Sequence, residues 1–370
     1  MNGDIHKRKE KEMLYRYPDY YDRFACIADR CEETCCAGWQ IVIDEDALEK
    51  YREKLSGKKD DRIDWEEGVF CQSGEKRCAF LNDRNLCDMY IEWGEDYLCE
   101  TCRRYPRHIE EFENIREYTL SLSCPEAAQI ILGNREKVTF IEKEDELEEE
   151  DEEFDDLLFS MLADVREVLY EILQNRQLSI RQRILLLLDV TEKCQEKIDE
   201  DDIFAINDVI EKYSHDEKKE PVLEDASNYE KSLARFQMLF QMELLNDLWA
   251  DMTDEAAELV YGGGESVYRK EHHEFETWLA VHYKDYDIIL EQILVYFIST
   301  YFCGAVYDGD MTGKTQMAVT SLVCISEMLF ARWKKNGKEL DFSDIVTIAY
   351  MYSRELEHSD VNLELFSGAE

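Results

Sequence analysis

The cysteines of this chain are concentrated toward its N-terminus and could ligate a metal. Ten of the 13 cysteines lie within the first 124 residues, and only His6 and His108 accompany them there. A metal in this region would therefore be bound almost wholly by thiolates, which suit zinc, copper(I) or an iron–sulfur cluster rather than magnesium or calcium. The ten positions are Cys26, Cys31, Cys35, Cys36, Cys71, Cys78, Cys87, Cys99, Cys102 and Cys124.

The spacing of these cysteines fails to match two well-known sites and leaves the ligand subset open. A zinc ribbon needs two facing C-x2-C pairs, and only Cys99 and Cys102 make one. The radical-enzyme signature C-x3-C-x2-C begins at Cys31 and Cys35, but Cys36 follows directly instead of three positions on. Because a metal centre takes about four protein ligands, the set could close one site or two.

Cationic residues follow the C-x2-C pair in an otherwise acidic chain. Arg103, Arg104 and Arg107 all lie within a few residues of Cys102. Guanidinium groups stabilise thiolates, and they also bind carboxylates or phosphates through two parallel hydrogen bonds. Arg103 and Arg107 are therefore candidates to bind the carboxylate of a substrate or cofactor. The alternative is that they balance the charge of the thiolates or pair with surface glutamates.

Short elements are predicted to position the first cysteines. Residues Gln40–Ile43 favour a short strand, and Asp44 is a typical N-cap for a helix that ends before Ser56. Residues 80–87 are typical of a small hairpin or turn.

A strand over Glu117–Ser121 and a helix after it are predicted to position the last cysteine of the set. Ser123 and Glu126 fit the S-x-x-E capping box, which would open a helix through Ala127. Cys124 would then lie at a helix N-terminus, which also favours its thiolate.

Composition divides the chain into a cysteine-rich metal-binding module over residues 1–140, an acidic linker over 141–157 and an α-helical domain over 158–370. Residues 142–156 contain twelve acidic residues in fifteen positions, which is typical of a solvated linker or the first turns of an exposed helix. Beyond them, apolar residues recur at helical spacing, and proline is nearly absent. The fold class is therefore mainly α, with few short strands in the module and a bundle behind it. Helices are predicted at 157–172, 180–190, 236–248, 288–307, 316–332 and 342–356. The segment from Phe236 to Leu248 is predicted from a stripe of apolar residues. A loop at 308–313 joins the helices at 288–307 and 316–332.

The overall charge excludes several classes of partner. Lys plus Arg is 43 and Asp plus Glu is 85, a formal net charge of -42, which argues against nucleic acid and against anionic membrane surfaces. The N-terminus is charged and lacks the apolar stretch of a secretory signal. The longest charge-free apolar run, Ile293–Tyr307, is shorter than the ~20 residues of a membrane span and favours a buried helix. We expect a cytoplasmic protein, in which thiols stay reduced and serve metal or redox chemistry.

Several cysteine-containing segments together resemble the flagellin lysine-N-methylase family. They are Cys31-Glu-Glu-Thr-Cys35-Cys36-Ala-Gly-Trp39, Cys78-Ala-Phe-Leu81 with Leu86-Cys87, Gly94-Glu-Asp-Tyr-Leu98, Thr101-Cys102-Arg-Arg-Tyr-Pro-Arg107, and Leu120-Ser-Leu-Ser-Cys124-Pro-Glu-Ala-Ala128. The resemblance rests on specific motifs over roughly residues 14 to 132. In the helical remainder of the chain, it extends only to the general apolar, helical pattern of the sequence and to its length.

The resemblance implies a protein that methylates lysine ε-amines of flagellin. It also implies S-adenosylmethionine as methyl donor and an iron–sulfur cluster of the [4Fe–4S] type. Zinc is the alternative metal, because thiolates suit it as well. The positions that fall on the family pattern are Cys26, Cys31, Cys35, Cys36, Cys78, Cys87, Cys99, Cys102 and Cys124; Cys71 lies outside it.

Methyl transfer to an amine is a displacement at a sulfonium carbon and needs no radical. The lysine must first lose a proton from a group whose ordinary pKa is ~10.4, so burial or a nearby base is required. Trp39 and Tyr105 are candidates to flank the sulfonium through cation–π contact, and packing beside the cysteines is their alternative role. The sequence identifies no catalytic base. Two other functions stay open, a non-enzymatic zinc- or iron-binding module and a radical S-adenosylmethionine enzyme of different chemistry.

Overall fold

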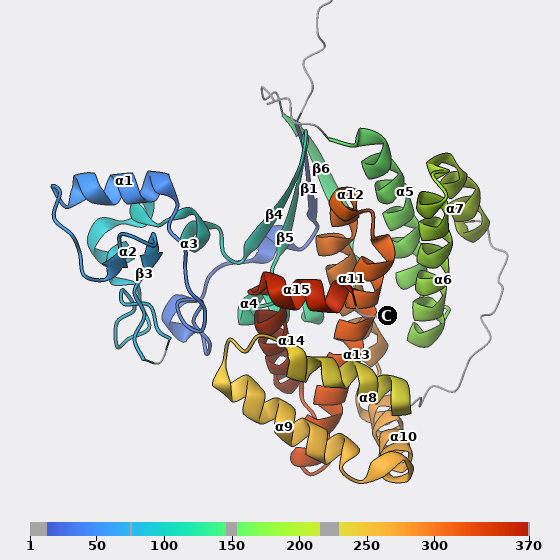
Figure 1. The fold of residues 1–370 in the computed structure, drawn as a ribbon. Helices are drawn as coiled ribbons and strands as arrows, with labels where there is room; N and C mark the ends of the chain where they lie inside the picture. Colours follow the sequence, from blue (N-terminus) through green and yellow to red (C-terminus); the bar gives the residue numbers. More distant parts are fainter. Residues whose placement is uncertain (1–12, 75, 146–153, 215–228, 369–370) are drawn as a thin grey trace, which may run out of the picture.

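A small N-terminal lobe and a larger helical body make up the chain (Figure 1). The computed structural model describes residues 13–74, 76–145, 154–214 and 229–368. Helices dominate, as predicted, and two separate hydrophobic cores lie one in each part.

The small lobe contains short elements joined by turns. Its core consists of eleven buried residues between Ile41 and Cys99. The predicted helix after Asp44 is confirmed, because the Asp44 carboxylate accepts a hydrogen bond from the Ala47 amide at 2.9 Å and starts the helix. The predicted strand at Gln40–Ile43 is reduced to a single bridge between Val42 and Val69. The elements of the lobe are α1 (Glu45–Lys54), β2 (Ile63–Asp64), β3 (Val69–Phe70), α2 (Asp88–Trp93) and α3 (Glu100–Arg104).

A four-stranded sheet lies between the lobe and the helices (Figure 1). Its strand order is β4-β5-β1-β6, in which β1 pairs parallel to β5 and antiparallel to β6. Phe112 and Leu120 from this sheet are buried in the large core, so the sheet packs with the helical body and not with the cysteine-rich lobe. The division by core therefore does not follow the predicted boundary at residue 140. The strands are β1 (Met13–Pro18), β4 (Arg107–Phe112), β5 (Ile115–Leu120) and β6 (Phe140–Asp145).

The helical body is built around two buried helices. Helix α11 is buried along nearly all its length, and α13 packs against α6, α9 and α11. The segment Tyr286–Asp308 is long and apolar enough to cross a membrane, but 83% of its apolar window is buried inside the protein, as in a core helix. The helices are α4 (Pro125–Gly133), α5 (Asp156–Leu173), α6 (Ile180–Asp199), α7 (Ile206–Ser214), α8 (Tyr229–Gln237), α9 (Asp247–Tyr261), α10 (Gly264–His282), α11 (Tyr286–Tyr301), α12 (Ala305–Asp308), α13 (Met311–Lys335), α14 (Phe342–Glu357) and α15 (Asp360–Ser367).

Two predicted local features are wrong. The acidic linker is in part a strand, because residues 141–145 pair with β1 through β6; residues 146–153 lie outside the described residues. The stripe from Phe236 to Leu248 is not one helix, since α8 ends at Gln237 and extended chain at 242–246 precedes α9. Phe240 and Leu248 are accordingly half exposed.

Two helix starts also differ from prediction. Helix α4 forms, but its N-cap is Cys124 and no side chain caps it. The Ser123 hydroxyl is instead engaged by Tyr105, Ser121 and His358, so long-range partners replace the predicted capping box. Helix α13 begins at Met311, which shortens the predicted loop at 308–313.

Candidate functional site

Backbone pairing draws the cysteines of the small lobe together. The Cys78 amide donates to the Cys36 carbonyl at 2.8 Å, and Cys87 bridges Leu81 at the end of the predicted turn. Cys99 is the N-cap of α3, and its thiol is hydrogen bonded to that of Cys102 one turn on. The thiols of Cys35 and Cys36 form a second hydrogen-bonded pair.

The nine predicted ligand cysteines form a continuous series of electrostatic neighbours. Cys26 interacts with Cys31 and Cys35, and Cys31 interacts with Cys124. Deeper in the lobe, Cys36 interacts with Cys78, Cys87 and Cys102, and Cys99 interacts with Cys78 and Cys102. The fold therefore gathers cysteines that are separated by up to about a hundred positions in sequence.

The thiols are gathered, but they do not form a closed metal cage. Among the described residues, no group of three or more His, Cys, Asp or Glu side chains is arranged to hold a metal ion. None of the 13 cysteines is in a disulfide, so the thiols stay available as ligands. The chemistry of the donor set fits zinc or an iron–sulfur cluster, although the arrangement of the side chains fixes no ligand subset.

Two of the thiols are favoured as thiolates. A hydrogen bond from Cys35 lowers the pKa of Cys36 to about 7, and a hydrogen bond from Cys102 lowers the pKa of Cys99. Burial has the opposite effect elsewhere and raises the pKa of Cys78 to about 12 and that of Cys124 to about 11. Because metal ligation needs the thiolate, Cys36 and Cys99 would lose their protons at the lowest cost.

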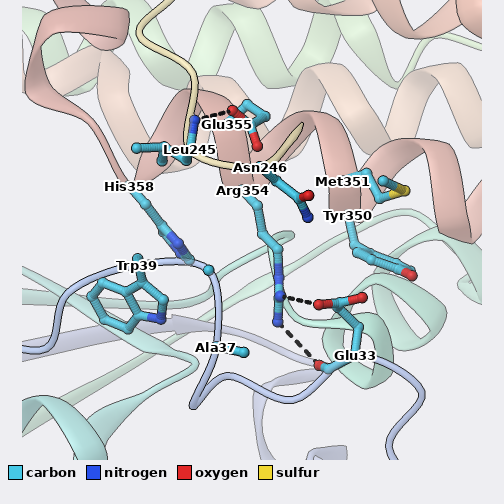
Figure 2. Close-up of a pocket in the computed structure, with 11 residues that line it drawn as sticks. Glu33, Ala37, Trp39, Leu245, Asn246, Tyr350, Met351, Arg354, Glu355 and His358 are labelled. Carbon is cyan, nitrogen blue, oxygen red and sulfur yellow. Dashed lines mark hydrogen bonds and ion pairs between the residues drawn. The ribbon is translucent and has the colours of Figure 1, made fainter. Parts of the chain in front are cut away.

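A pocket lies where the loop carrying Cys31, Cys35 and Cys36 meets helix α14 (Figure 2). Its cavity volume is about 20 Å³, and the rest of the hollow is open to solvent. One wall comes from the cysteine loop, another from the extended chain before α9, and the third from the last two turns of α14. The lining residues are Glu33, Ala37, Gly38, Trp39, Leu245, Asn246, Tyr350, Met351, Arg354, Glu355 and His358.

Arg354 crosses from α14 to the cysteine loop (Figure 2). Its Nη1 donates to the Glu33 carboxylate and its Nη2 to the Glu33 carbonyl, both at 3.0 Å. Its Nε donates to the Ser123 carbonyl, also at 3.0 Å. Arg354 is 9% exposed, and its charge is balanced by the Glu33 carboxylate.

Aromatic rings surround the inner side of this arginine. The His358 ring lies 4.6 Å from the Trp39 ring, and Tyr105 lies 6.0 Å from each of them. Burial, followed by the nearby Arg354 charge, lowers the pKa of His358 to about 3, so the imidazole is neutral at physiological pH. The Trp39 indole donates to the Cys35 carbonyl at 2.8 Å, which holds the ring against the cysteine loop.

Glu355 supplies a carboxylate that titrates near neutrality. Burial raises the pKa of Glu355 to about 7, although the Leu245 and Asn246 amides donate to it and oppose the rise. Asn362 donates to the backbone carbonyls of both Glu355 and Glu243. The extended chain at 242–246 is therefore fixed to α14 and α15, and it keeps the carboxylate at the pocket wall.

The structure separates the predicted cofactor-binding residues. Trp39 lines the pocket, and Tyr105 packs behind it against Trp39 and His358. Arg103 is exposed and donates to the Leu98 carbonyl, whereas Arg107 lies over the rings of Tyr21 and Phe24.

Sequence reasoning missed Arg354, Glu355 and His358. Their signal was weak, since it consists of charged residues near the end of the last long, otherwise buried helix. Arg354 and not Arg103 or Arg107 is the guanidinium that lines the pocket.

Comparisons with known proteins agree on one family. Residues 166–369 match the family model for the FliB lysine N-methylase C-terminal domain. A stretch of 145 residues, 36% of this chain, is 28% identical to a lysine-N-methylase of Salmonella typhimurium and covers 36% of that protein. A 145-residue stretch is also 27% identical to the flagellar biosynthetic protein FliU of Salmonella muenchen and covers 85% of it.

The curated relatives are matched over different shares of their length. The chain spans about a third of the lysine-N-methylases of Salmonella typhimurium and Salmonella choleraesuis, the latter at 27% identity. No solved structure matches the chain significantly.

Proposed function

The chain belongs to the FliB lysine N-methylase family, and on this premise we propose that it methylates lysine ε-amines of flagellin with S-adenosylmethionine as methyl donor. The observation that carries the proposal is the pocket between the family-matched helices and the cysteine loop. This pocket combines a carboxylate that titrates near pH 7, an indole ring and a guanidinium. The carboxylate suits an ammonium substrate, the indole ring suits a sulfonium, and the guanidinium suits a carboxylate.

Glu355 is the proposed base. Its carboxylate accepts a proton from the substrate lysine ammonium, and the freed nitrogen lone pair attacks the methyl carbon. The carbon–sulfur bond breaks as the carbon–nitrogen bond forms, which leaves S-adenosylhomocysteine. A base with a pKa near the working pH is the most effective, and such bases contribute about 10²–10⁴-fold in rate.

Trp39 is the proposed contact for the sulfonium. A cation over an indole ring gains about 0.5–2 kcal/mol, and the hydrogen bond from Trp39 to Cys35 keeps the ring in place. Tyr105 supports this ring from behind. The Arg354 guanidinium is already paired with Glu33, so its role in this proposal is to hold the cysteine loop at the pocket wall.

We propose that the cysteines hold an iron–sulfur cluster, with zinc as the alternative metal. Its ligands would come from Cys26, Cys31, Cys35, Cys36, Cys78, Cys87, Cys99, Cys102 and Cys124. When bound, such a cluster can stabilise the lobe or bind the amino and carboxylate groups of S-adenosylmethionine at an open iron.

The proposed setting is the cytoplasm, with flagellin as the protein partner. The net charge of -42 supports this choice of substrate, because an acidic surface attracts lysine-bearing segments and steers their encounter.

Anaerobic purification with iron, sulfide and zinc analysis tests the metal, and incubation with flagellin and S-adenosylmethionine tests the reaction. We expect about four irons and four sulfides per chain, as for one cubane cluster. We also expect S-adenosylhomocysteine in equal amount to the methyl groups on lysine. Zinc without iron or sulfide, even after reconstitution, would reject the cluster. Formation of 5′-deoxyadenosine would reject direct displacement.

Glu355→Gln tests the base. The amide still accepts a hydrogen bond from Leu245 but cannot take a proton. The rate of methyl transfer should fall by about 10²–10⁴-fold. In the unmodified protein, kcat/KM should rise through pH 7 as Glu355 loses its proton. An unchanged rate and profile would exclude Glu355 as the base.

A further inference from the structure

We infer that Arg354 is a positioning residue through which helix α14 sets the location of the thiols beside the pocket. Its guanidinium joins the loop that carries Cys31 and Cys35 to the turn that precedes Cys124. The meaning of this link for catalysis rests on the proposed function, but the link itself can be tested without methyl transfer.

One carbonyl connects Arg354 to the Cys31 thiol. The Cys31 Sγ donates to the Glu33 carbonyl at 3.2 Å, and the same carbonyl accepts from Arg354 Nη2 at 3.0 Å. Arg354 Nη1 holds the Glu33 side chain at the same time. The thiol and the guanidinium therefore share an acceptor, and loss of the arginine frees both the backbone and the side chain at Glu33.

The third nitrogen of Arg354 reaches a distant part of the chain. Its Nε donates to the Ser123 carbonyl, directly before Cys124. Glu33 and Ser123 are separated by ninety positions, and the two segments meet at one rigid, planar group. Lysine could not do the same, because a single ammonium lacks the fork geometry that binds several acceptors in fixed directions.

His358, one helical turn after Arg354, makes a parallel connection. Its Nε2 lies 3.1 Å from the Ser123 hydroxyl, and its ring packs against Trp39, which donates to the Cys35 carbonyl. Figure 2 shows both side chains projecting from α14 toward the cysteine loop. Two side chains on one helix face thus control the segments that carry Cys31, Cys35 and Cys124.

Charge and burial distinguish this link from an ordinary surface ion pair. Arg354 is 9% exposed, and its charge interacts with the thiols of Cys31, Cys35, Cys36 and Cys124. The lobe and the helical body have separate cores. The polar contacts of Arg354, together with the packing of Trp39 on His358, join the two parts at the pocket.

Alkylation of individual cysteines, followed by mass spectrometry of the anaerobically purified full chain, tests the inference. The variants are Arg354→Met, which keeps the length of the side chain without its donors, and Arg354→Lys, which keeps a charge. Arg332→Met is the matched control, because Arg332 also pairs with a carboxylate, that of Asp344, but within the helical body.

Other cysteines of the chain serve as internal controls for the alkylation experiment. Cys71 is partly exposed and lies outside the proposed ligand set, so it should label at the same rate in every variant. Cys99 is buried in the small core, and Cys194, Cys303 and Cys324 are buried in the large one, so they report whether each part stays folded.

We expect Arg354→Met to speed alkylation of Cys31, Cys35 and Cys124 by at least about 10-fold, equivalent to about 1.4 kcal/mol. Arg354→Lys should restore part of the protection, and Arg332→Met should leave it unchanged. Metal content, measured on the same samples, should fall in Arg354→Met only. Equal protection in Arg354→Met and the unmodified protein would overturn the inference, as would full protection in Arg354→Lys, which lacks the fork.

A second variant covers the case in which Arg354→Met unfolds the helical body and exposes Cys194, Cys303 and Cys324. Glu33→Ala retains Arg354 and the shared backbone carbonyl but removes the carboxylate that accepts from Nη1. It should therefore speed alkylation of Cys31 and Cys35 by less than Arg354→Met does, while those three stay protected. Protection of Cys31 in that variant would overturn the inference. If the thiols respond as expected and no methyl transfer is found, the proposed function fails and the positioning role stands.

Discussion

The two cores of the molecule differ in what holds them together. The small core contains eleven buried residues, two of which are cysteines, and its strands are two residues long. The large core joins the sheet to buried helices such as α11 and α13. Lobes of about 80 residues or fewer rarely stabilise themselves by burial alone, and they often need metals or other crosslinks. We therefore expect the cysteine-rich lobe to gain more stability from thiol ligation and from its contact with α14 than the helical body gains from either.

Removal of one phenylalanine from each core gives the largest predicted effect. Phe80→Ala and Phe297→Ala should each cost about 3–5 kcal/mol, because both rings are buried. The small core contains fewer buried residues and therefore has less stabilising energy in reserve. Phe80→Ala should open the lobe to proteolysis while the helical body stays resistant. Phe297→Ala should lower the stability of the body without selective cleavage of the lobe. Identical cleavage patterns for the two variants would contradict the contrast between the cores.

The carboxylate at the junction should make stability fall as pH rises. The pKa of Glu355 is raised from its ordinary 4.5 to about 7, so between these values the folded state holds a proton that the unfolded state has lost. Stability from this group is therefore greatest at low pH and is lost toward pH 7, by about 3 kcal/mol in total.

Denaturant unfolding at several pH values, with Glu355→Gln as the comparison, measures this effect. The variant cannot ionise at this position and should lack this part of the decline. A decline of equal size in both proteins would show that Glu355 is not its source.

The same substitution in the two regions separates metal ligation from packing. Cys102→Ser should weaken metal binding by at least about 100-fold, since loss of an outer-shell partner alone costs about 10–100-fold. Cys324→Ser, buried in the helical body, should retain the metal and change only stability. Metal titration of both variants provides the measurement, and equal affinities would remove Cys102 from the ligand set.

Helix caps give the smallest predicted effect. Asp44 accepts hydrogen bonds from the Ala47 amide at the start of α1 and from the Glu100 amide at the start of α3. Asp341 caps α14 alone. Asp44→Ala should cost about 1–2 kcal/mol and Asp341→Ala about 1 kcal/mol, with the first loss confined to the lobe. Hydrogen exchange of α1 and α14 would show this, and slower exchange in α1 than in α14 after matched substitution would contradict it.

Local patterns predicted the elements that depend on neighbouring residues. The helix after Asp44, the strand predicted at 117–121 and the helix predicted at 342–356 all form, over 45–54, 115–120 and 342–357. The pairing of β1 with β5 and β6 could not be predicted from local patterns. These strands are about a hundred residues apart in sequence, and their register depends on the assembled core. For the same reason Ser123 fits a capping box in sequence, although tertiary partners engage it in the structure.

The candidate site was predictable on one side only. The cysteines and Trp39 stand in a dense local pattern, so their part of the site could be found from the sequence. Arg354 lies 321 positions from Glu33. No local signal connects the two, and the arginines near Cys102 were the more obvious candidates. The half of the pocket that α14 contributes is visible only once the chain is folded.

Mass analysis of flagellin lysines, with quantification of both nucleoside products, tests the central claim most directly. The full chain, purified without oxygen, is incubated with flagellin and S-adenosylmethionine. We predict methylated lysine ε-amines and one S-adenosylhomocysteine per methyl group, with transfer slowed by about 10²–10⁴-fold in Glu355→Gln and retained in Arg332→Met. Unmodified flagellin after incubation with metal-replete protein would contradict the account, as would an unchanged rate of methylation in Glu355→Gln.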